Sequence, residues 1–219
     1  MIGIDLDGTI EDSRRDMASS VGRIRAQLGL PARPPEAIYP WMNRGMDLLY
    51  RSCFDDYVQG SEVRLAEIRR RYERDYLENV AHETKPYPGI PEALRLLAEM
   101  RPLVVVTNKP ERISRRLLEA LKIDKFFAAI VGGDTCAASK PDPMILAEAV
   151  RRCGSDPGNG RCVMVGDSSA DIKMGRAYGA LTVWCEWGYA RNPEETPDLI
   201  AKHPRELPNL VRVAIENKR

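Results

Sequence analysis

From residue 84 onward, short apolar runs alternate with amphipathic segments, and this alternation restricts the possible folds more than any other feature of the sequence. Each run resembles a buried strand, and each segment between runs has apolar residues at helical spacing. The expected strands are residues 2–5, 103–107, 128–134, 161–167 and 181–185. The expected helices between them are residues 111–123, 141–154 and 169–179. Continuous apolar strands separated by helices predict a parallel sheet that helices cover on both faces.

The segment between the first strand and residue 84 has a different pattern. Residues 14–83 show helical spacing, and no strand pattern interrupts them. Ser61 is placed to cap the last of three expected helices. One face of that helix would consist of Leu65, Ile68, Tyr72 and Tyr76. We therefore expect an α/β core domain of residues 1–13 and 84–219 and an inserted helical domain of residues 14–83.

The C-terminal tail carries a weaker pattern. We expect one or two short helices there, around residues 197–201 and 207–216, that pack on the edge of the sheet.

The composition gives no reason to expect a polyanionic partner. The chain has 33 basic and 32 acidic residues and a net charge of +1, so no global field would attract nucleic acid or an anionic membrane. No apolar run approaches the roughly 18 residues of a membrane span. Five scattered cysteines without a C-x-x-C pair are typical of reduced thiols, and a strand that begins at residue 2 leaves no room for a secretory leader. We expect a cytoplasmic monomer or homodimer that binds neither nucleic acid nor membrane.

Polar and charged residues stand where the predicted strands end. In chain order they are Asp5 and Asp7 after the first strand, Thr107, Asn108 and Lys109 after the second, Lys140 after the third, and Asp167 and Asp171 after the fourth. In a parallel sheet the carboxyl ends of the strands meet at one edge, where ligands bind. We therefore expect these side chains to converge on one site.

Such a group of carboxylates requires a cation. Two like charges about 4 Å apart repel by about 4 kcal/mol at an effective dielectric near 20, so carboxylates sharing a pocket either protonate or bind a positive ion. The predicted site offers oxygen ligands without a nearby histidine or cysteine, which favours Mg²⁺ over zinc. Lys140 and the Thr107–Asn108 pair could then bind the oxygens of a phosphate.

Simpler explanations exist for each residue taken alone. Asp5 could belong to a turn, Thr107 to a strand, Lys140 to the solvated surface, and Asp167 with Ser168 could cap a helix. Their occurrence at four consecutive strand ends is harder to explain in this way. Receiver domains also place acidic residues, Thr and Lys on a parallel sheet, but in a different chain order. Neither a G-x-x-x-x-G-K-[ST] loop nor a G-x-G-x-x-G fingerprint occurs.

Four motifs together resemble those of the haloacid dehalogenase superfamily. They are DLDGT at 5–9, VVVTN at 104–108, Lys140 in SKPDP, and GDSSAD at 166–171. The segments TNKP, KPDP and VWCEWGY resemble its phosphoglycolate phosphatase-like branch, in which a helical cap is inserted between the first and second motifs. The resemblance implies an α/β fold with a Rossmann-like parallel sheet, and it implies that residues 14–83 form the cap.

The resemblance also implies the catalytic roles. Asp5 would attack phosphorus and form an aspartyl-phosphate, and Asp7 would protonate the leaving oxygen and then activate water. Gly8 would allow the tight turn between them. Members that cleave carbon–halogen or carbon–phosphorus bonds lack an acid at the position of Asp7, so its presence favours phosphate esters.

The remaining motif residues would bind the metal and the phosphate. The implied Mg²⁺ ligands are the Asp5 carboxylate, the Asp7 main-chain carbonyl and Asp167, with Asp171 behind them or reaching the ion through water. The implied phosphate-binding groups are Thr107, the amide of Asn108, and Lys140, which also counts among the catalytic residues. Lys109 could line the site or pair with Asp171.

In this branch the cap selects the substrate. The stretch PWMNRGMDLL resembles the cap loop around a glycine, here Gly45, and Arg44 beside it could reach a second polar group of the substrate or be a surface residue. The leading hypothesis is a Mg²⁺-dependent phosphatase acting on a small phosphorylated metabolite, similar to phosphoglycolate. The alternatives are phosphoryl transfer like that of β-phosphoglucomutase, pyrophosphatase activity on the same scaffold, and a non-catalytic binding protein, which the filled catalytic positions disfavour.

Overall fold

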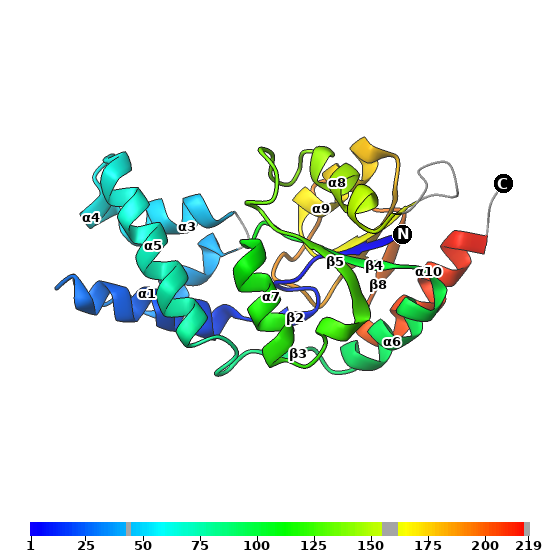
Figure 1. Ribbon diagram of the computed structural model, residues 1–219, viewed down its shortest axis with the longest axis horizontal. Helices are drawn as coiled ribbons and strands as arrows, with labels where there is room; N and C mark the ends of the chain where they lie inside the picture. Colours follow the sequence, from blue (N-terminus) through cyan, green and yellow to red (C-terminus); the bar gives the residue numbers. More distant parts are fainter. Residues whose placement is uncertain (43–44, 155–161, 217–219) are drawn as a thin grey trace. The chain divides into compact units, whose positions relative to one another are not determined.

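A computed structural model describes residues 1–42, 45–154 and 162–216 (Figure 1). The chain forms two compact units. The core unit consists of Met1–Asp12 and Pro86–Arg219, and the helical unit consists of Ser13–Lys85. Among the described residues, no helix is both long enough and apolar enough to cross a membrane. The role of the helical unit as a cap stays a prediction.

A six-stranded parallel sheet forms the centre of the core unit. Its strand order is β5-β4-β1-β6-β7-β8. The strands are β1 (Ile2–Ile4), β4 (Leu103–Val106), β5 (Phe127–Val131), β6 (Val163–Gly166), β7 (Leu181–Cys185) and β8 (Leu199–Ala201). In the central strand β1, Ile4 is in register with Val105 of β4 and Val165 of β6. The five strands expected from the sequence are therefore confirmed.

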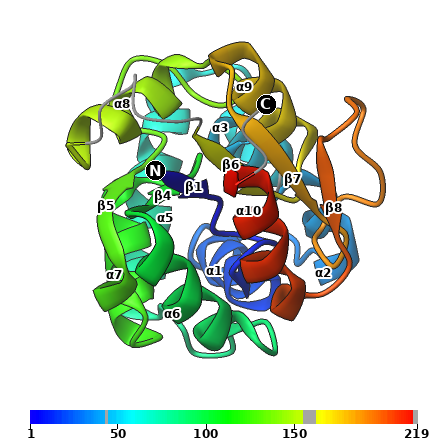
Figure 2. The same cartoon turned by 90° about the vertical axis from the view of Figure 1, so that its right-hand side faces the viewer.

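Helices cover both faces of this sheet. They are α6 (Ile90–Met100), α7 (Glu111–Ala120), α8 (Met144–Arg152), α9 (Ser169–Tyr178) and α10 (Leu207–Glu216), with short turns η2 (Asp124–Phe126) and η3 (Pro204–Glu206). Helices α8 and α9 lie on one face, and α6, α7 and α10 lie on the other (Figure 2). Ile2 and Ile4 are completely buried between these layers. This arrangement confirms the predicted α/β class.

The prediction of a helix around residues 197–201 is wrong, because residues 199–201 form the edge strand β8. The carboxylate of Asp198 accepts hydrogen bonds from the main-chain N–H and the hydroxyl of Thr182, at 2.8 and 2.7 Å, and so fixes the start of β8 against β7. At the other end, the Glu186 N–H donates to the Ala201 carbonyl at 2.9 Å. Pairing along β7 thus outweighs the local helical pattern, as tertiary context often does for a short segment. The second predicted tail helix is confirmed as α10.

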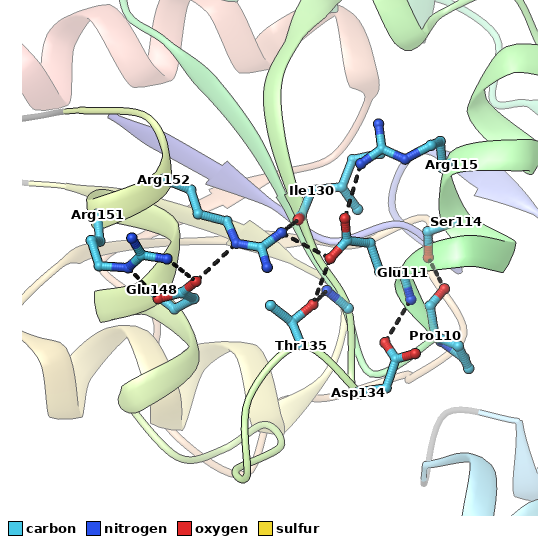
Figure 3. A network of polar contacts seen from close by, with 11 residues as sticks. Pro110, Glu111, Ser114, Arg115, Ile130, Asp134, Thr135, Glu148, Arg151 and Arg152 are labelled. Carbon is cyan, nitrogen blue, oxygen red and sulfur yellow. Dashed lines mark hydrogen bonds and ion pairs between the residues drawn. The ribbon is translucent and has the colours of Figure 1, made fainter.

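The opposite edge of the sheet is protected by an arginine. Arg152 of α8 donates to the main-chain carbonyl of Ile130 in β5 at 2.9 Å and to Glu111 of α7 at 2.8 Å (Figure 3). Glu111 also accepts from Thr135 at 3.0 Å. A charged side chain on an edge carbonyl opposes pairing with another chain, because that carbonyl already has a donor.

The helical unit contains α1 (Arg14–Gln27), α2 (Pro35–Ile38), η1 (Tyr39–Trp41), α3 (Met46–Cys53), α4 (Asp55–Val58) and α5 (Glu62–Glu78). The hydroxyl of Ser61 accepts from Arg64 N–H at 3.4 Å at the start of α5, as predicted. The predicted face of α5, which is Leu65, Ile68, Tyr72 and Tyr76, is buried. Strands β2 (Glu11–Asp12) and β3 (Lys85–Pro86) pair where the chain passes between the units.

A buried aspartate ties the two ends of the helical unit together. Asp16, in the first turn of α1, accepts hydrogen bonds from the N–H groups of Glu83 and Thr84 at 3.0 and 2.9 Å and from the Thr84 hydroxyl at 2.6 Å. Asp16 is only 4% exposed, so water cannot replace these bonds. Hydrogen bonds to a charged group contribute about 1.5–3 kcal/mol each.

We predict that Asp16→Ala lowers the free energy of unfolding by about 3 kcal/mol, because two main-chain N–H groups and the buried Thr84 hydroxyl lose their acceptor. Urea unfolding followed by circular dichroism measures this. Asp47→Ala is the control, since Asp47 forms an exposed ion pair with Arg69 and should cost less than about 1 kcal/mol. Equal losses in the two variants would contradict the role of Asp16.

Candidate active site

The carboxyl ends of three adjacent strands deliver the predicted acidic residues and Thr107 to one edge of the sheet. Asp5 follows β1 and its N–H donates to the Val165 carbonyl at 2.9 Å, while Thr107 follows β4 and donates to the Val131 carbonyl at 3.0 Å. Asp167 follows β6 directly. These bonds extend the ladder by one residue beyond each strand, so the side chains start from fixed backbone positions.

Three carboxylates gather at this edge. Asp5, Asp167 and Asp171 are all buried, and each has an oxygen within 4.8 Å of an oxygen of the others. Burial, together with the charge of Asp171, raises the pKa of Asp5 well above its ordinary value. Burial and Asp171 likewise raise the pKa of Asp167 to about 7. The cluster therefore holds its negative charge at a high electrostatic cost.

Lys140 supplies the compensating positive charge. Its Nζ lies 2.7 Å from Asp5 Oδ1 and 2.8 Å from Asp171 Oδ1. Burial alone would lower the pKa of this lysine, but the charges of Asp171 and Asp5 raise it above its ordinary value. Lys140 is therefore charged and bridges two carboxylates.

Asn108 positions the main chain of Lys140. The Lys140 N–H donates to Asn108 Oδ1 at 2.9 Å, and Asn108 Nδ2 donates to the Lys140 carbonyl at 3.4 Å. Beside it, the Thr107 hydroxyl accepts from the Lys109 N–H at 3.1 Å. The amide side chain of Asn108 is thus used within the protein, which leaves the main-chain amide as the group for the predicted phosphate contact.

Asp171 belongs to the cap of helix α9. Its Oδ2 accepts from the N–H and the hydroxyl of Ser168, at 3.0 and 2.6 Å, in a reciprocal capping box. Its other oxygen binds Lys140. A side chain on Gly166 would clash with this carboxylate, because an added Cβ would lie 2.3 Å from Asp171 Cγ. Both oxygens of Asp171 are thus engaged by protein donors, and its place behind the metal ligands stays a prediction.

Gly8 makes the turn between the first two aspartates possible. It has φ +86°, which L side chains rarely adopt, and an added Cβ would lie 2.4 Å from Asp167 Oδ2. Its N–H donates to the Glu11 carbonyl at 2.9 Å. Only glycine fits here, as predicted for the turn.

Asp7 lies beside Lys109 and Glu11. Lys109 is 3% exposed and pairs with Asp7 Oδ1, so it lines the site, whereas the ion pair of Asp171 is made with Lys140. Glu11 is fully buried, and its pKa is raised well above the ordinary value by burial and by the charge of Asp7. No role for Glu11 was predicted, because nothing in the local sequence distinguishes it from a polar turn residue.

The donor set suits a hard divalent cation. Asp5 and Asp167 offer carboxylate oxygens that lie close together in a buried site, and no histidine or cysteine belongs to the described cluster. A second group, Asp16, His82 and Glu83, lies in the helical unit. There the Asp16 oxygens already accept three hydrogen bonds from the main chain and Thr84, and this supports a structural role.

The predicted cap residues lie in the helical unit. Gly45 precedes α3 with φ +93°, and nothing lies within 4 Å of the position of an added Cβ. Arg44 lies outside the described residues. Their role in selecting the substrate stays a prediction.

Sequence reasoning missed the groups that hold Asp167. The Thr9 hydroxyl donates to Asp167 Oδ1 at 3.0 Å, and the Tyr189 N–H donates to Oδ2 at 2.7 Å. Tyr189 lies in the segment VWCEWGY, which resembles the phosphoglycolate phosphatase-like branch but does not by itself indicate a contact with Asp167. The Tyr189 donor is a main-chain N–H group, which every residue except proline has, so the residue type at this position does not indicate the bond. Only the resemblance of the whole segment to the family could have indicated it.

We predict that the free energy of unfolding of Glu11→Gln, minus that of the wild type, increases as pH rises. A carboxyl with a raised pKa in the folded state stabilises below its unfolded pKa and loses that contribution as pH rises through the folded pKa, whereas glutamine stays neutral. Urea unfolding at pH 5 and pH 8 measures the difference. The control is Glu78→Gln at an exposed position. If the difference in free energy of unfolding between Glu11→Gln and the wild type were the same at both pH values, the raised pKa of Glu11 would be contradicted.

Comparison with known proteins identifies the family of this chain. Residues 2–185 match the haloacid dehalogenase-like hydrolase family. The phosphoglycolate phosphatase of Aquifex aeolicus (strain VF5) is 32% identical over 212 residues, which cover 96% of each protein, and that of Chromobacterium violaceum (strain ATCC 12472) is 35% identical over 214 residues, again 96% of each. The crystal structure of a predicted phosphoglycolate phosphatase from Haemophilus somnus 129pt has a TM-score of 0.85 at 29% identity and covers 96% of this chain and 97% of that one. The chain therefore belongs to the haloacid dehalogenase-like hydrolases and is a phosphatase.

Proposed function

We propose that this phosphatase hydrolyses a small phosphate monoester, with phosphoglycolate as the first candidate, through a phosphorylated Asp5 and with Mg²⁺ as cofactor. The observation that carries the proposal is the placement of Lys140 between Asp5 and Asp171 at the carboxyl ends of the strands. A nucleophilic carboxylate beside a buried ammonium group is the arrangement that attack on an anionic substrate requires.

In the first step, an oxygen of Asp5 attacks phosphorus and the bond from phosphorus to the ester oxygen breaks. The leaving oxygen takes a proton from Asp7, which Lys109 holds in place. The charge of Lys140, the Thr107 hydroxyl and the amide of Asn108 bind the phosphoryl oxygens. The product is the free alcohol, and the phosphoryl group remains on Asp5.

In the second step, Asp7 accepts a proton from water, and the resulting hydroxide attacks phosphorus. The bond between phosphorus and the Asp5 oxygen breaks, which releases inorganic phosphate and restores the Asp5 carboxylate. One residue thus acts as nucleophile and the other as acid and then base.

The proposed Mg²⁺ ligands are Asp5, the main-chain carbonyl of Asp7, and Asp167, with Asp171 behind them. When bound, the ion supplies positive charge that offsets the repulsion between an anionic nucleophile and an anionic phosphate. The acidic cluster supports this assignment, because its three carboxylates have only one close ammonium partner, Lys140, among the described residues.

The choice of phosphoglycolate rests on the relatives that carry this name. We further propose that the helical unit acts as the cap, with Arg44 and Gly45 near the substrate. Transfer of the phosphoryl group back to a sugar, as in a phosphoglucomutase, and cleavage of pyrophosphate are the alternatives. A cytoplasmic location and a monomeric or dimeric state stay predictions.

We predict that Asp5→Asn lowers phosphate release by at least about a thousandfold, because the variant lacks the nucleophile. The assay measures inorganic phosphate with Mg²⁺ and a panel of phosphoglycolate, sugar phosphates and pyrophosphate. Asp7→Asn removes both the acid and the base, so it should also lower phosphate release, and any phosphorylated protein that forms should persist long enough to be seen by intact-protein mass spectrometry. Asp124→Asn, at an exposed position, is the control. Equal release by the wild type and Asp5→Asn would exclude Asp5 as nucleophile.

We predict that affinity for Mg²⁺ falls about tenfold between pH 8 and pH 6. Asp167 has a pKa raised to about 7 by burial and by Asp171, so a cation must displace a proton from it at lower pH. Isothermal titration calorimetry in two buffers of different ionisation enthalpy measures both the affinity and the protons released. An affinity that is the same at both pH values, without proton release, would contradict Asp167 as a ligand.

A further inference from the structure

Two glycines from distant parts of the chain enclose the Asp167 side chain. An added Cβ on Gly8 would lie 2.4 Å from Asp167 Oδ2, and one on Gly188 would lie 2.1 Å from Asp167 Cβ. Gly188 does not have a φ in the left-handed region, so alanine could adopt its backbone conformation. The restriction at Gly188 is therefore one of space alone, and it comes from the contact with Asp167.

The same loop supplies directed hydrogen bonds. We call residues 187–189, which follow β7, the 187–189 loop. The Tyr189 N–H donates to Asp167 Oδ2 at 2.7 Å. Trp187 Nε1–H donates to the Thr9 carbonyl at 3.1 Å, and the Thr9 hydroxyl donates to Asp167 Oδ1 at 3.0 Å. Each carboxylate oxygen thus accepts one bond from a donor that the loop provides or holds.

The two hydrogen bonds fix the orientation of the Asp167 carboxylate. An ionised carboxylate oxygen has about two lone-pair sites, so one bond to each oxygen fixes the plane of the group and leaves a site on each for a cation. Asp167 is 1% exposed and Thr9 is completely buried, so water does not compete for these positions. A carboxylate oriented before the ion arrives loses less conformational freedom when it binds.

We propose that the 187–189 loop is a positioning element for the cation site, which sets metal affinity by holding the carboxylate of Asp167 in its binding orientation. This inference rests on the proposed function, in which Asp167 is a metal ligand. Gly188 allows the close approach, Tyr189 orients one oxygen through its main chain, and Trp187 fixes the other through Thr9. The loop follows β7, which neighbours β6, so the sheet itself brings it to Asp167.

The test measures binding of Mn²⁺ by electron paramagnetic resonance and of Mg²⁺ by competition with Mn²⁺, which requires no turnover. Gly188→Ala should weaken binding about ten- to a hundredfold, because the methyl group displaces Asp167. Trp187→Phe keeps an aromatic ring but removes the donor to Thr9, and it should weaken binding roughly three- to tenfold. Gly22→Ala is the matched control, since nothing lies within 4 Å of its added Cβ.

Asp167→Asn separates this proposal from the one on which it rests. If Asp167→Asn weakens Mn²⁺ binding while folded Gly188→Ala and Trp187→Phe bind as the wild type does, the cation site stands and the loop proposal is wrong. If Asp167→Asn binds Mn²⁺ as the wild type does, Asp167 is not a ligand and both proposals fail. Near-ultraviolet circular dichroism without metal shows whether each variant is folded. If Gly188→Ala does not fold, Mn²⁺ binding by Trp187→Phe alone tests the role of the 187–189 loop.

Discussion

The candidate site depends on the burial of one lysine among three carboxylates. Lys140 contacts Asp5 and Asp171, and Asp167 lies within the same cluster. Fully ionised, three carboxylates and one ammonium group have a net charge of −2, and each close pair of like charges costs about 4 kcal/mol at an effective dielectric near 20. Without a bound cation, the pKa values of Asp5 and Asp167 are raised. Burial is the larger cause of both shifts, and the charge of Asp171 adds to it. A divalent cation would offset this imbalance of negative charge without protonation, and this supports the proposed cofactor.

This imbalance is maintained by the sheet rather than by the site residues themselves. The central strand β1 has β4 and β6 as its parallel neighbours, so Asp5, Thr107 and Asp167 leave the sheet side by side. Apolar strands buried on both faces leave little room for these ends to move apart and relieve the repulsion. Glycines at positions 8, 166 and 188 let the neighbouring backbone approach the aspartates closely. The core thus provides the rigidity that concentrated like charge requires.

The sequence predicted those parts of the structure whose cause is local. Each strand and the residue that ends it are adjacent in the chain, so Asp5, Thr107 and Asp167 could be located from apolar runs alone. The convergence of the strand ends follows from the parallel sheet, but the individual hydrogen bonds that hold Asp167 were not predicted. Thr9 and Asp167 are 158 residues apart, and Trp187 and Thr9 are 178 apart. The edge strand β8 was wrongly expected to be a helix for the same reason, since its pairing with β7 decides its conformation.

The two leading aspartates have separate electrostatic partners, and this separation suits the proposed division of labour. Lys140 pairs with both Asp5 and Asp171. When a substrate phosphate binds to Lys140, the lysine therefore still has a carboxylate partner. Lys109 pairs with Asp7, and the buried Glu11 lies next to that pair. In the proposed mechanism Asp7 must change its protonation state twice while Asp5 is esterified and released. Separate lysines allow the charge around one aspartate to change while the other keeps its own counter-ion, which a single shared lysine could not provide.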